Sequence, residues 1–207
     1  MTTKERIAEE ALNLFSVKGF RGTSVKNIAD AVGIKDSSLY KHYKSKKEIF
    51  DGIVLEMRKR MENMSQYIGL PDDSDIQASA RMYGELTLEN LLELSRKIFL
   101  FYLTDDFISK FWRVATMEQY QNEEIYDIFR HIFMEESITY QTLVFREMIR
   151  NGIFIEVNPE VIAINFYTPI FFLLSKYNGR AEGKAEGLEI LENQIKEFYR
   201  IYRKKNV

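Results

Sequence analysis

Residues 34–46, "IKDSSLYKHYKSK", combine two tyrosines, a histidine, three serines and four lysines in one short run. The run is too polar for a buried helix and too aromatic for an ordinary solvent-facing surface. Ammonium, hydroxyl and imidazole groups are the donors that reach phosphate oxygens and the edges of bases. These residue types therefore indicate binding chemistry directed at a polyanion.

Catalytic chemistry is not indicated by the same criteria. The chain has two histidines, His42 and His131, which lack metal-ligand spacing, and it has no cysteine. It contains no glycine-rich phosphate loop, GxSxG or HExxH motif. The sequence predicts no enzyme, no catalytic residue, no metal site and no cofactor. An enzymatic function is the alternative, and detectable turnover of a substrate would support it.

The charge distribution supports a polyanion partner at one end of the chain. Residues 1–60 hold 13 Lys and Arg against 8 Asp and Glu, a net charge of +5. The remaining 147 residues hold 16 against 23, a net charge of −7, and the two sum to the total of −2. A basic excess confined to one segment is typical of a nucleic-acid-binding element.

The elements that must position the polar run read as short helices. Thr2 and Glu5 form a capping box before a first helix, and Lys18-Gly19 is a stop signal. Thr23 or Ser24 can cap a second helix. The apolar residues of these two helices recur at helical spacing. They are Ile7, Ala8, Ala11, Leu12 and Phe15 in the first helix, and Val25, Ile28, Ala29 and Val32 in the second.

A tight turn separates the second helix from the polar run. Gly33 supplies a backbone position free to take positive φ, and a third helix has room for about residues 36–43. Leu39 and Tyr43 alternate onto its buried side, so we expect Tyr43 in the core. Ser45 with Glu48 then reads as a capping box that opens a long fourth helix.

The remainder of the chain reads as helical, and the fold class is all-α. The loop at 69–75, "GLPDDSD", is the best hinge after the fourth helix. Strand signals are nearly absent. Further helices are expected at about 76–102, 104–119, 122–151, 158–177 and 186–204.

Two short helices joined by a tight turn, with a small Ala29 at their crossing, have helix-turn-helix geometry, in which the second helix enters a DNA major groove. The segment "GFRGTSVKNIADAVGIKDSSLYKHYKSKKEIF" resembles the DNA-binding domain of the TetR family of bacterial transcription repressors. The resemblance covers about the first 60 residues. It rests on Ala11, Leu12, Phe15, Gly19, Thr23, Ile28, Ala29, Gly33, Leu39, Tyr40, His42, Tyr43, Lys46 and Phe50.

The resemblance implies a role for each polar residue of the segment. Thr23, Tyr40 and Lys46 match positions that contact backbone phosphate, and His42 matches one that contacts phosphate or a base edge. Lys35, Ser37 and Lys41 occupy variable positions and would read bases. One departure is Lys35, which stands where the family often has a serine or threonine cap. The cap of the third helix either passes to Asp36 or is absent.

The same resemblance implies two domains and a dimer. Residues 1–46 would form the DNA-binding domain, with the helix-turn-helix at about 24–43, and residues 47–207 the ligand-binding and dimerisation domain. The partner would be double-stranded DNA with a palindromic operator, bound by a ligand-responsive homodimeric repressor. The helices at about 158–177 and 186–204 would pair across the two-fold axis. A seam at three- and four-residue spacing would face the partner: Leu188, Leu191, Ile195, Phe198 and Tyr202. Alternatively, the seam packs within its own subunit.

The effector would be a small apolar or aromatic molecule held among large side chains in the middle of the chain. The candidates are Phe107, Phe111, Trp112, Tyr126, Phe129, Phe133 and Phe166. Rings at helical spacing are also what a filled core contains. Pro169, inside an apolar helix, either opens a pocket or shapes the dimer face.

An alternative function is a DNA-binding helical protein without a small-molecule effector, acting through a protein partner or as a nucleoid factor. The first ten residues lack the apolar core of a signal peptide. The least polar run, 161–174, is shorter than the roughly 20 residues a membrane helix needs. We therefore expect no membrane association and a cytoplasmic, nucleoid-associated protein of a bacterium.

Overall fold

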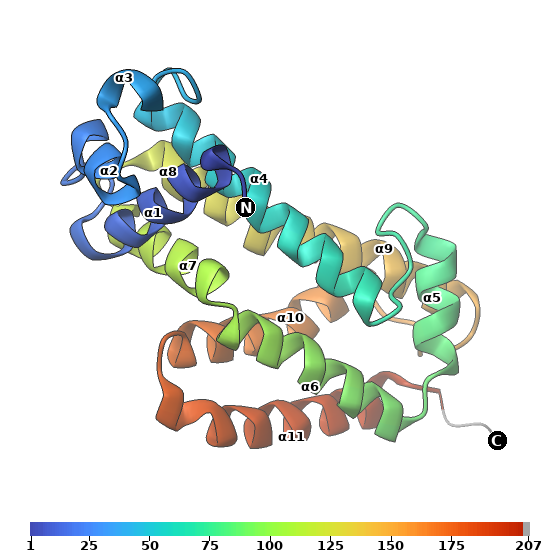
Figure 1. Cartoon of the computed structure of the whole chain (residues 1–207). Helices are drawn as coiled ribbons and strands as arrows, with labels where there is room; N and C mark the ends of the chain where they lie inside the picture. Colours follow the sequence, from blue (N-terminus) through green and yellow to red (C-terminus); the bar gives the residue numbers. More distant parts are fainter. Residues whose placement is uncertain (205–207) are drawn as a thin grey trace. The chain divides into compact units, whose positions relative to one another are not determined.

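The computed structural model describes residues 1–204, most of which are helical (Figure 1). Within that range no β-strand forms, and Phe154 and Arg203 make an isolated antiparallel bridge. The prediction of an all-α fold is confirmed. In chain order the elements are α1 (Thr3–Lys18), α2 (Val25–Val32), α3 (Asp36–Leu39), α4 (Lys46–Tyr67), α5 (Ile76–Glu85), α6 (Leu88–Thr104), α7 (Asp106–Glu118), α8 (Glu123–Arg130), a π-helical segment η1 (His131–Glu136), α9 (Ser137–Arg150), α10 (Pro159–Tyr177), a 3₁₀ turn η2 (Ala181–Gly183) and α11 (Lys184–Tyr202).

The chain divides into two compact units that are each discontinuous in sequence. The first unit contains residues 1–64 and 105–129, which hold α1, α2, α3 and α7 and most of α4 and α8. The second unit contains residues 65–104 and the chain from 130 onward. Neither unit ends at residue 46, so the expected division into 1–46 and 47–207 remains a prediction about function.

The first unit is built around α1 and a row of aromatic rings. The predicted capping box at its start is present, with the Thr2 hydroxyl accepting from the Glu5 N–H and the Glu5 carboxylate accepting from the Thr2 N–H. Successive ring centroids lie 5.1, 5.9 and 5.8 Å apart. The rings are Phe15, Phe20, Phe50 and Phe111. This row joins α1, α4 and α7, so α7 is part of the core on which the helix-turn-helix rests.

The second unit has its own aromatic core, where α9, α10 and α11 meet. Phe198 of α11 is 4% exposed and contacts the rings of Phe145, Phe154, Phe166 and Tyr202, with centroids 4.8–6.0 Å apart. Aromatic pairs at these separations contribute beyond the area they bury. Among residues 1–204, no helix is long and apolar enough to cross a membrane.

The single helix expected at 76–102 is wrong, because two helices occupy that range. Leu86 leaves the helical conformation at ψ 132°, and the Thr87 hydroxyl accepts from the Asn90 N–H at 3.2 Å, capping α6. The Arg203 guanidinium donates to the freed carbonyl of Gly84 at 2.7 Å. The residue that stabilises this break is 119 positions away in sequence, so local periodicity does not show it.

The predicted dimer seam on α11 faces its own subunit. Leu191, Ile195 and Phe198 are at most 4% exposed within the single chain, and Leu188 and Tyr202 are partly buried. The alternative, packing within the subunit, is therefore correct for this face. The spacing of apolar residues identifies a buried face but does not say which surface buries it.

Pro169 lies inside α10, and the helix continues through it. Its missing N–H leaves the Asn165 carbonyl, four residues earlier, without its helical donor. The Gln194 side-chain amide of α11 donates to that carbonyl at 3.4 Å, and the Asn165 amide donates to the Tyr202 hydroxyl at 2.9 Å. The interruption in α10 is thus used to join α10 to α11.

We predict that Phe198→Ala destabilises the chain by ~3–5 kcal/mol, because it removes a ring with four aromatic neighbours and leaves a cavity. Equilibrium unfolding in urea at one fixed chain concentration measures this loss. Tyr67→Ala is the matched control, since Tyr67 is 91% exposed and should change stability little. Equal losses in the two variants would contradict the assigned core.

Candidate nucleic-acid interface

The helix-turn-helix is formed by local hydrogen bonds that the residue types specify. Ser24, rather than Thr23, caps α2: its hydroxyl accepts from the Asn27 N–H at 3.1 Å, and the Asn27 side chain accepts from the Ser24 N–H. Gly33 ends α2 in the left-handed conformation at φ 75° and ψ 35°, which glycine adopts without strain. The Ala29 carbonyl then accepts from the N–H of Gly33 and of Ile34.

The recognition element is a short α-helix that tightens at its end. Regular α-helix covers Asp36–Leu39, and helical turns continue to Tyr43, whose N–H donates to the Leu39 carbonyl at 3.1 Å. The N–H groups of Lys41 and His42 bond three residues back instead of four, which is typical of a tightened last turn. The predicted helix at about 36–43 is therefore longer than the regular α-helix that the structure has.

The first residues of α3 show which of the two alternatives for its N-terminal cap is correct. Lys35 is the N-cap residue, in extended conformation, and it makes no side-chain cap hydrogen bond. Asp36 stands inside the first turn, where a negative charge favours the positive end of the helix dipole. The side-chain cap is absent, so the polar side chains at this end are not committed to capping.

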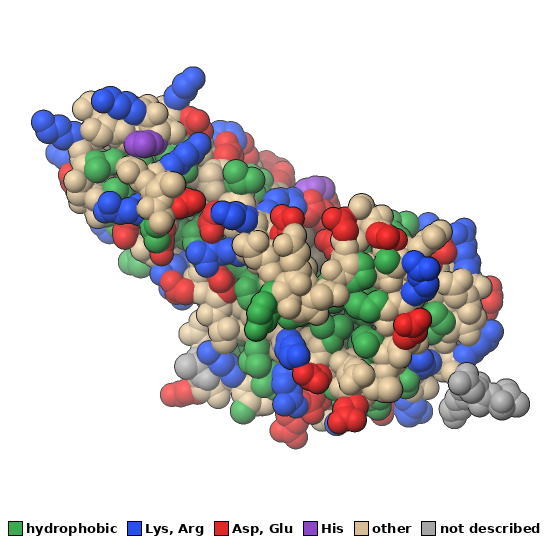
Figure 2. All heavy atoms as spheres, turned by 45° about the vertical axis from the view of Figure 1, so that its right-hand side comes forward, with side chains coloured by type: hydrophobic (Ala, Val, Ile, Leu, Met, Phe, Trp, Pro, Cys, Tyr) green, Lys and Arg blue, Asp and Glu red, His purple; other side chains and the backbone are tan. Residues whose placement is uncertain are grey.

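The predicted DNA-contacting side chains of this element are accessible to solvent. Lys35, Ser37, Tyr40 and Lys41 are exposed, and His42 is partly exposed. Figure 2 shows Lys and Arg side chains over these elements. Tyr40 is 51% exposed, which leaves its hydroxyl free to reach a phosphate. Leu39 is fully buried beneath them and fixes the element to the core.

Tyr43 lies on the opposite, buried side, as predicted. It is 3% exposed, burial raises the pKa of its hydroxyl, and that hydroxyl donates to the Lys4 carbonyl at 3.3 Å. A Cβ at residue 52 would lie 2.6 Å from the Tyr43 oxygen, so glycine is required at that point of α4. Tyr43 therefore joins the recognition element to both α1 and α4.

Thr23 and Lys46, both expected to contact phosphate, are engaged within the protein. Thr23 is 1% exposed, and its hydroxyl donates to the Gly19 carbonyl at 2.9 Å. The Lys46 ammonium donates to the carbonyls of Phe20 at 2.6 Å and Thr23 at 2.9 Å, and lies 4.3 Å from the centre of the Phe20 ring. Burial lowers the pKa of Lys46, and the negative charge of Glu118 opposes that shift. In this conformation both residues hold the turn between α1 and α2.

The start of α4 carries a modified capping box. The Ser45 hydroxyl accepts from the Glu48 N–H at 3.0 Å, as expected. The Glu48 carboxylate, however, accepts from the N–H of Lys44 at 2.6 Å, one residue before the position in a standard box. Glu48 thereby holds the chain segment that connects the recognition element to α4.

One residue of this region was missed by sequence reasoning. Glu118, at the end of α7, is 3% exposed and accepts from the Phe20 N–H at 2.8 Å. Nearby, the Arg21 guanidinium donates to the Gln121 carbonyl, and Lys47 pairs with Glu124 at 2.8 Å. No local pattern links residues about 100 positions apart, so the sequence offers no signal for these contacts.

The seven effector candidates are divided between the two compact units. Phe107, Phe111, Trp112, Tyr126 and Phe129 belong to the first unit, and Phe133 and Phe166 to the second. Rings pack on rings within each unit, as Trp112 does on Phe129 with centroids 4.9 Å apart. Five of the seven are at most 6% exposed. Their burial accounts for their helical spacing.

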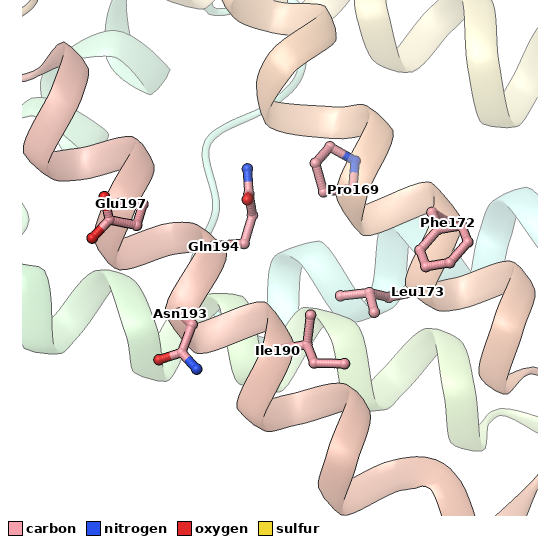
Figure 3. A pocket seen from close by; sticks show the side chains of 7 residues that line it. All are labelled: Pro169, Phe172, Leu173, Ile190, Asn193, Gln194 and Glu197. Carbon is pink, nitrogen blue, oxygen red and sulfur yellow. The ribbon is translucent and has the colours of Figure 1, made fainter.

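An open groove of about 300 Å³ lies between α10 and α11 and contains none of these seven residues (Figure 3). It is lined by Pro169, Phe172, Leu173, Ile190, Asn193, Gln194 and Glu197. Phe172 is 60% exposed and Ile190 40% exposed. Within residues 1–204, no group of three or more His, Cys, Asp or Glu side chains could hold a metal ion.

The second unit also contains tyrosine hydroxyls in largely apolar surroundings. Burial raises the pKa values of Tyr83, Tyr102 and Tyr140, and raises that of Tyr167 to about 12. The Tyr140 hydroxyl donates to Ser79 at 3.1 Å, and the Tyr167 hydroxyl donates to the Phe133 carbonyl in the π-helical segment. This hydrogen bond joins α10 to the π-helical segment.

Comparison with known proteins assigns the N-terminal segment. The family model described as bacterial regulatory proteins, tetR family, matches residues 7–53. The biofilm operon icaADBC HTH-type negative transcriptional regulator IcaR of Staphylococcus epidermidis is 42% identical over 64 residues. That match spans 31% of this chain and 31% of the relative, so the curated relative is matched over less than a third of its length.

Solved structures match the fold along the whole chain. A TetR family transcriptional regulator from Pseudomonas syringae is 20% identical, with a TM-score of 0.64 and coverage of 97% of each chain. A complex of SmeT with triclosan is 15% identical, with a TM-score of 0.70, covering 100% of this chain and 94% of that one. Residues 7–53 thus match the tetR family of bacterial regulatory proteins, and the fold of the chain is similar to that of these solved structures.

Proposed function

We propose that the protein is a sequence-specific DNA-binding transcriptional regulator that acts as a homodimeric repressor and responds to a ligand. The observation that carries this proposal is the exposed polar surface of the recognition element, formed by Lys35, Ser37, Tyr40 and Lys41. The segment that matches the tetR family model, residues 7–53, includes this surface. Repression by occupancy of a promoter needs no catalytic group.

The contacts divide into positioning and reading. Tyr40 offers a hydroxyl to backbone phosphate, and His42 lies beside it. Lys35, Ser37 and Lys41 are exposed at the start and middle of the element, where side chains reach base edges. For Thr23 and Lys46, contact with phosphate remains a prediction. To contact DNA, their polar groups would have to bind phosphate in addition to the internal hydrogen bonds described above.

A dimer is expected to form through α10 and α11, on a different face from the predicted seam. Val161, Ile164 and Phe172 of α10 and Ile190 and Ile201 of α11 are 40–60% exposed. Exposed apolar groups gathered on two adjacent helices, with a groove between them, are typical of a protein interface. Pairing two copies there would present two recognition elements to one palindromic operator, whose half-sites are about 34–36 Å apart.

A small-molecule effector is supported by related structures. SmeT is solved with triclosan, and a further TetR-type neighbour, FrrA, is described as a flavonoid-responsive regulator. We propose an apolar or aromatic effector for this chain. The second candidate function is DNA binding without an effector, and the burial of five of the seven candidate rings favours it. A thermal-shift screen separates the two, because a ligand that binds only the folded state raises the melting temperature.

The function is tested first by selecting genomic DNA fragments on the purified full-length protein, followed by sequencing and titration. We expect a short palindrome, strong salt dependence from phosphate contacts, and two chains per site. Diffuse, low-affinity binding without a common sequence would contradict a sequence-specific regulator.

Residues that contact phosphate and residues that contact bases should respond differently to substitution, and two variants test this difference. Tyr40→Phe should weaken binding to the operator and to its point-mutated versions alike, because it removes only a phosphate contact. Ser37→Ala should change the preference at one base pair by ~1–3 kcal/mol. Fluorescence anisotropy with the recovered operator and its single-base variants measures both. Tyr67→Phe, at a position 91% exposed, is the control. A preference change in Tyr40→Phe would contradict the assignment.

The dimer face predicts that Phe172→Glu weakens self-association by about 2 kcal/mol or more, because it places a charge in an apolar contact. Sedimentation velocity over a concentration series measures the change. Leu55→Glu is the matched control on α4, where Leu55 is 71% exposed. Two-chain assemblies that persist unchanged in Phe172→Glu would place the dimer contact elsewhere.

A further inference from the structure

Glu118 is a buried carboxylate that the DNA-binding surface does not use. It is 3% exposed, and one of its oxygens accepts from the Phe20 N–H at 2.8 Å. Its second oxygen is buried without a hydrogen-bond partner in the part of the chain that the structure describes. Burying a carboxylate with incomplete hydrogen bonding is costly, so its position calls for a compensating role.

The Glu118 contact is made on the turn between α1 and α2, directly before the helix-turn-helix. Gly19 permits the approach: a Cβ there would lie 3.1 Å from the bonded Glu118 oxygen, and its φ of +75° also favours glycine. In the next peptide group, the Phe20 carbonyl accepts from the Lys46 ammonium at 2.6 Å. The Phe20 residue is thus held by an anion at its N–H and a cation at its carbonyl.

The two charges also act on each other. The negative charge of Glu118 favours the protonated form of Lys46, which burial disfavours. Lys46 in turn contacts the Thr23 carbonyl, immediately before the cap of α2. Glu118 therefore acts on the start of the helix-turn-helix through Phe20 and Lys46, without a place on the DNA-facing surface.

The helix that carries Glu118 links this turn to the rest of the chain. A single residue, Asp105, separates α7 from α6, and its carboxylate caps α7 by accepting from the Ile108 N–H at 2.9 Å. Residues 65–104 belong to the second compact unit, and residues 105–129 to the first. In the chain α7 thus follows α6 almost directly, and Glu118 at its far end contacts Phe20.

We propose that Glu118 is a positioning residue through which α7 sets the orientation of the α1–α2 turn and, with it, the affinity for DNA. The proposal rests on the proposed function and concerns contacts within the first unit. A change in α7 that weakens the Glu118–Phe20 hydrogen bond would release the turn and lower operator affinity.

The test uses the full-length chain with Glu118→Ala, Glu118→Gln and Asp106→Asn. Asp106→Asn is the matched control, since it removes a carboxylate of α7 that is 78% exposed. The first readout is the Phe20 amide, by ¹H–¹⁵N spectroscopy and hydrogen exchange on the free protein. The second is the Kd for the operator recovered by genomic selection, measured at two salt concentrations. Melting temperatures are recorded for every variant.

In Glu118→Ala we expect faster exchange of the Phe20 amide and operator binding weakened by about tenfold, within the usual range of coupling between sites. The salt dependence should stay unchanged, because no phosphate contact is lost. Glu118→Gln keeps an acceptor for the Phe20 N–H but loses the charge opposite Lys46. Its amide should stay protected with a moved resonance, and its Kd should lie between those of wild type and Glu118→Ala. Asp106→Asn should match wild type.

Three results would overturn the proposal. The first is wild-type operator affinity in Glu118→Ala. The second is a salt slope reduced by about one in that variant, which marks a direct phosphate contact. The third is a loss of affinity that the unfolded fraction alone explains. If Glu118→Ala does not fold, Glu118→Gln decides, and an unchanged Phe20 resonance or an unchanged Kd is then the contrary result. The amide measurement needs no DNA, so failure to find an operator would contradict the proposed function and leave the contact separately tested.

Discussion

The backbone of Phe20 is the point on which the arrangement of the first unit depends. Its carbonyl accepts from the Lys46 ammonium and its N–H donates to the Glu118 carboxylate, while its ring packs between Phe15 and Phe50. Charge-assisted hydrogen bonds in a partly buried site are stronger than neutral ones, so they fix the turn between α1 and α2 firmly. The cap of α2 follows four residues later, and the orientation of the recognition element follows from α2.

The recognition element itself is short and contributes little stability of its own. Four residues of regular α-helix without a side-chain cap cannot persist in isolation, because helix nucleation is unfavourable. The burial of Leu39 and the Tyr43 hydrogen bond to Lys4 hold the element instead. Tertiary contacts on the inner side therefore leave every polar side chain of the outer side available for a partner.

The second unit uses its irregularities to join helices. Pro169 frees a carbonyl in α10 that Gln194 of α11 takes, and the π-helical segment offers the Phe133 carbonyl to Tyr167. Arg203 occupies the carbonyls left open where α5 ends. In each case a local break in helical hydrogen bonding is satisfied by a side chain distant in sequence, as buried backbone groups require. The groove beside Pro169 lies on the outer surface of the same α10–α11 pair.

The sequence by itself determined the helical class, the caps at Thr2, Ser45 and Gly33, the buried positions of Leu39 and Tyr43, and the polar surface of residues 35–42. These features depend on contacts within a few residues, where residue type and spacing fix the outcome. Only the tertiary structure decided the break at Leu86, the inward face of Leu191 and Ile195, the division of the seven rings between two units, and the contacts of Glu118 and Lys46 with Phe20. Each of these depends on which distant surface meets a given side chain, and neither periodicity nor composition encodes that choice.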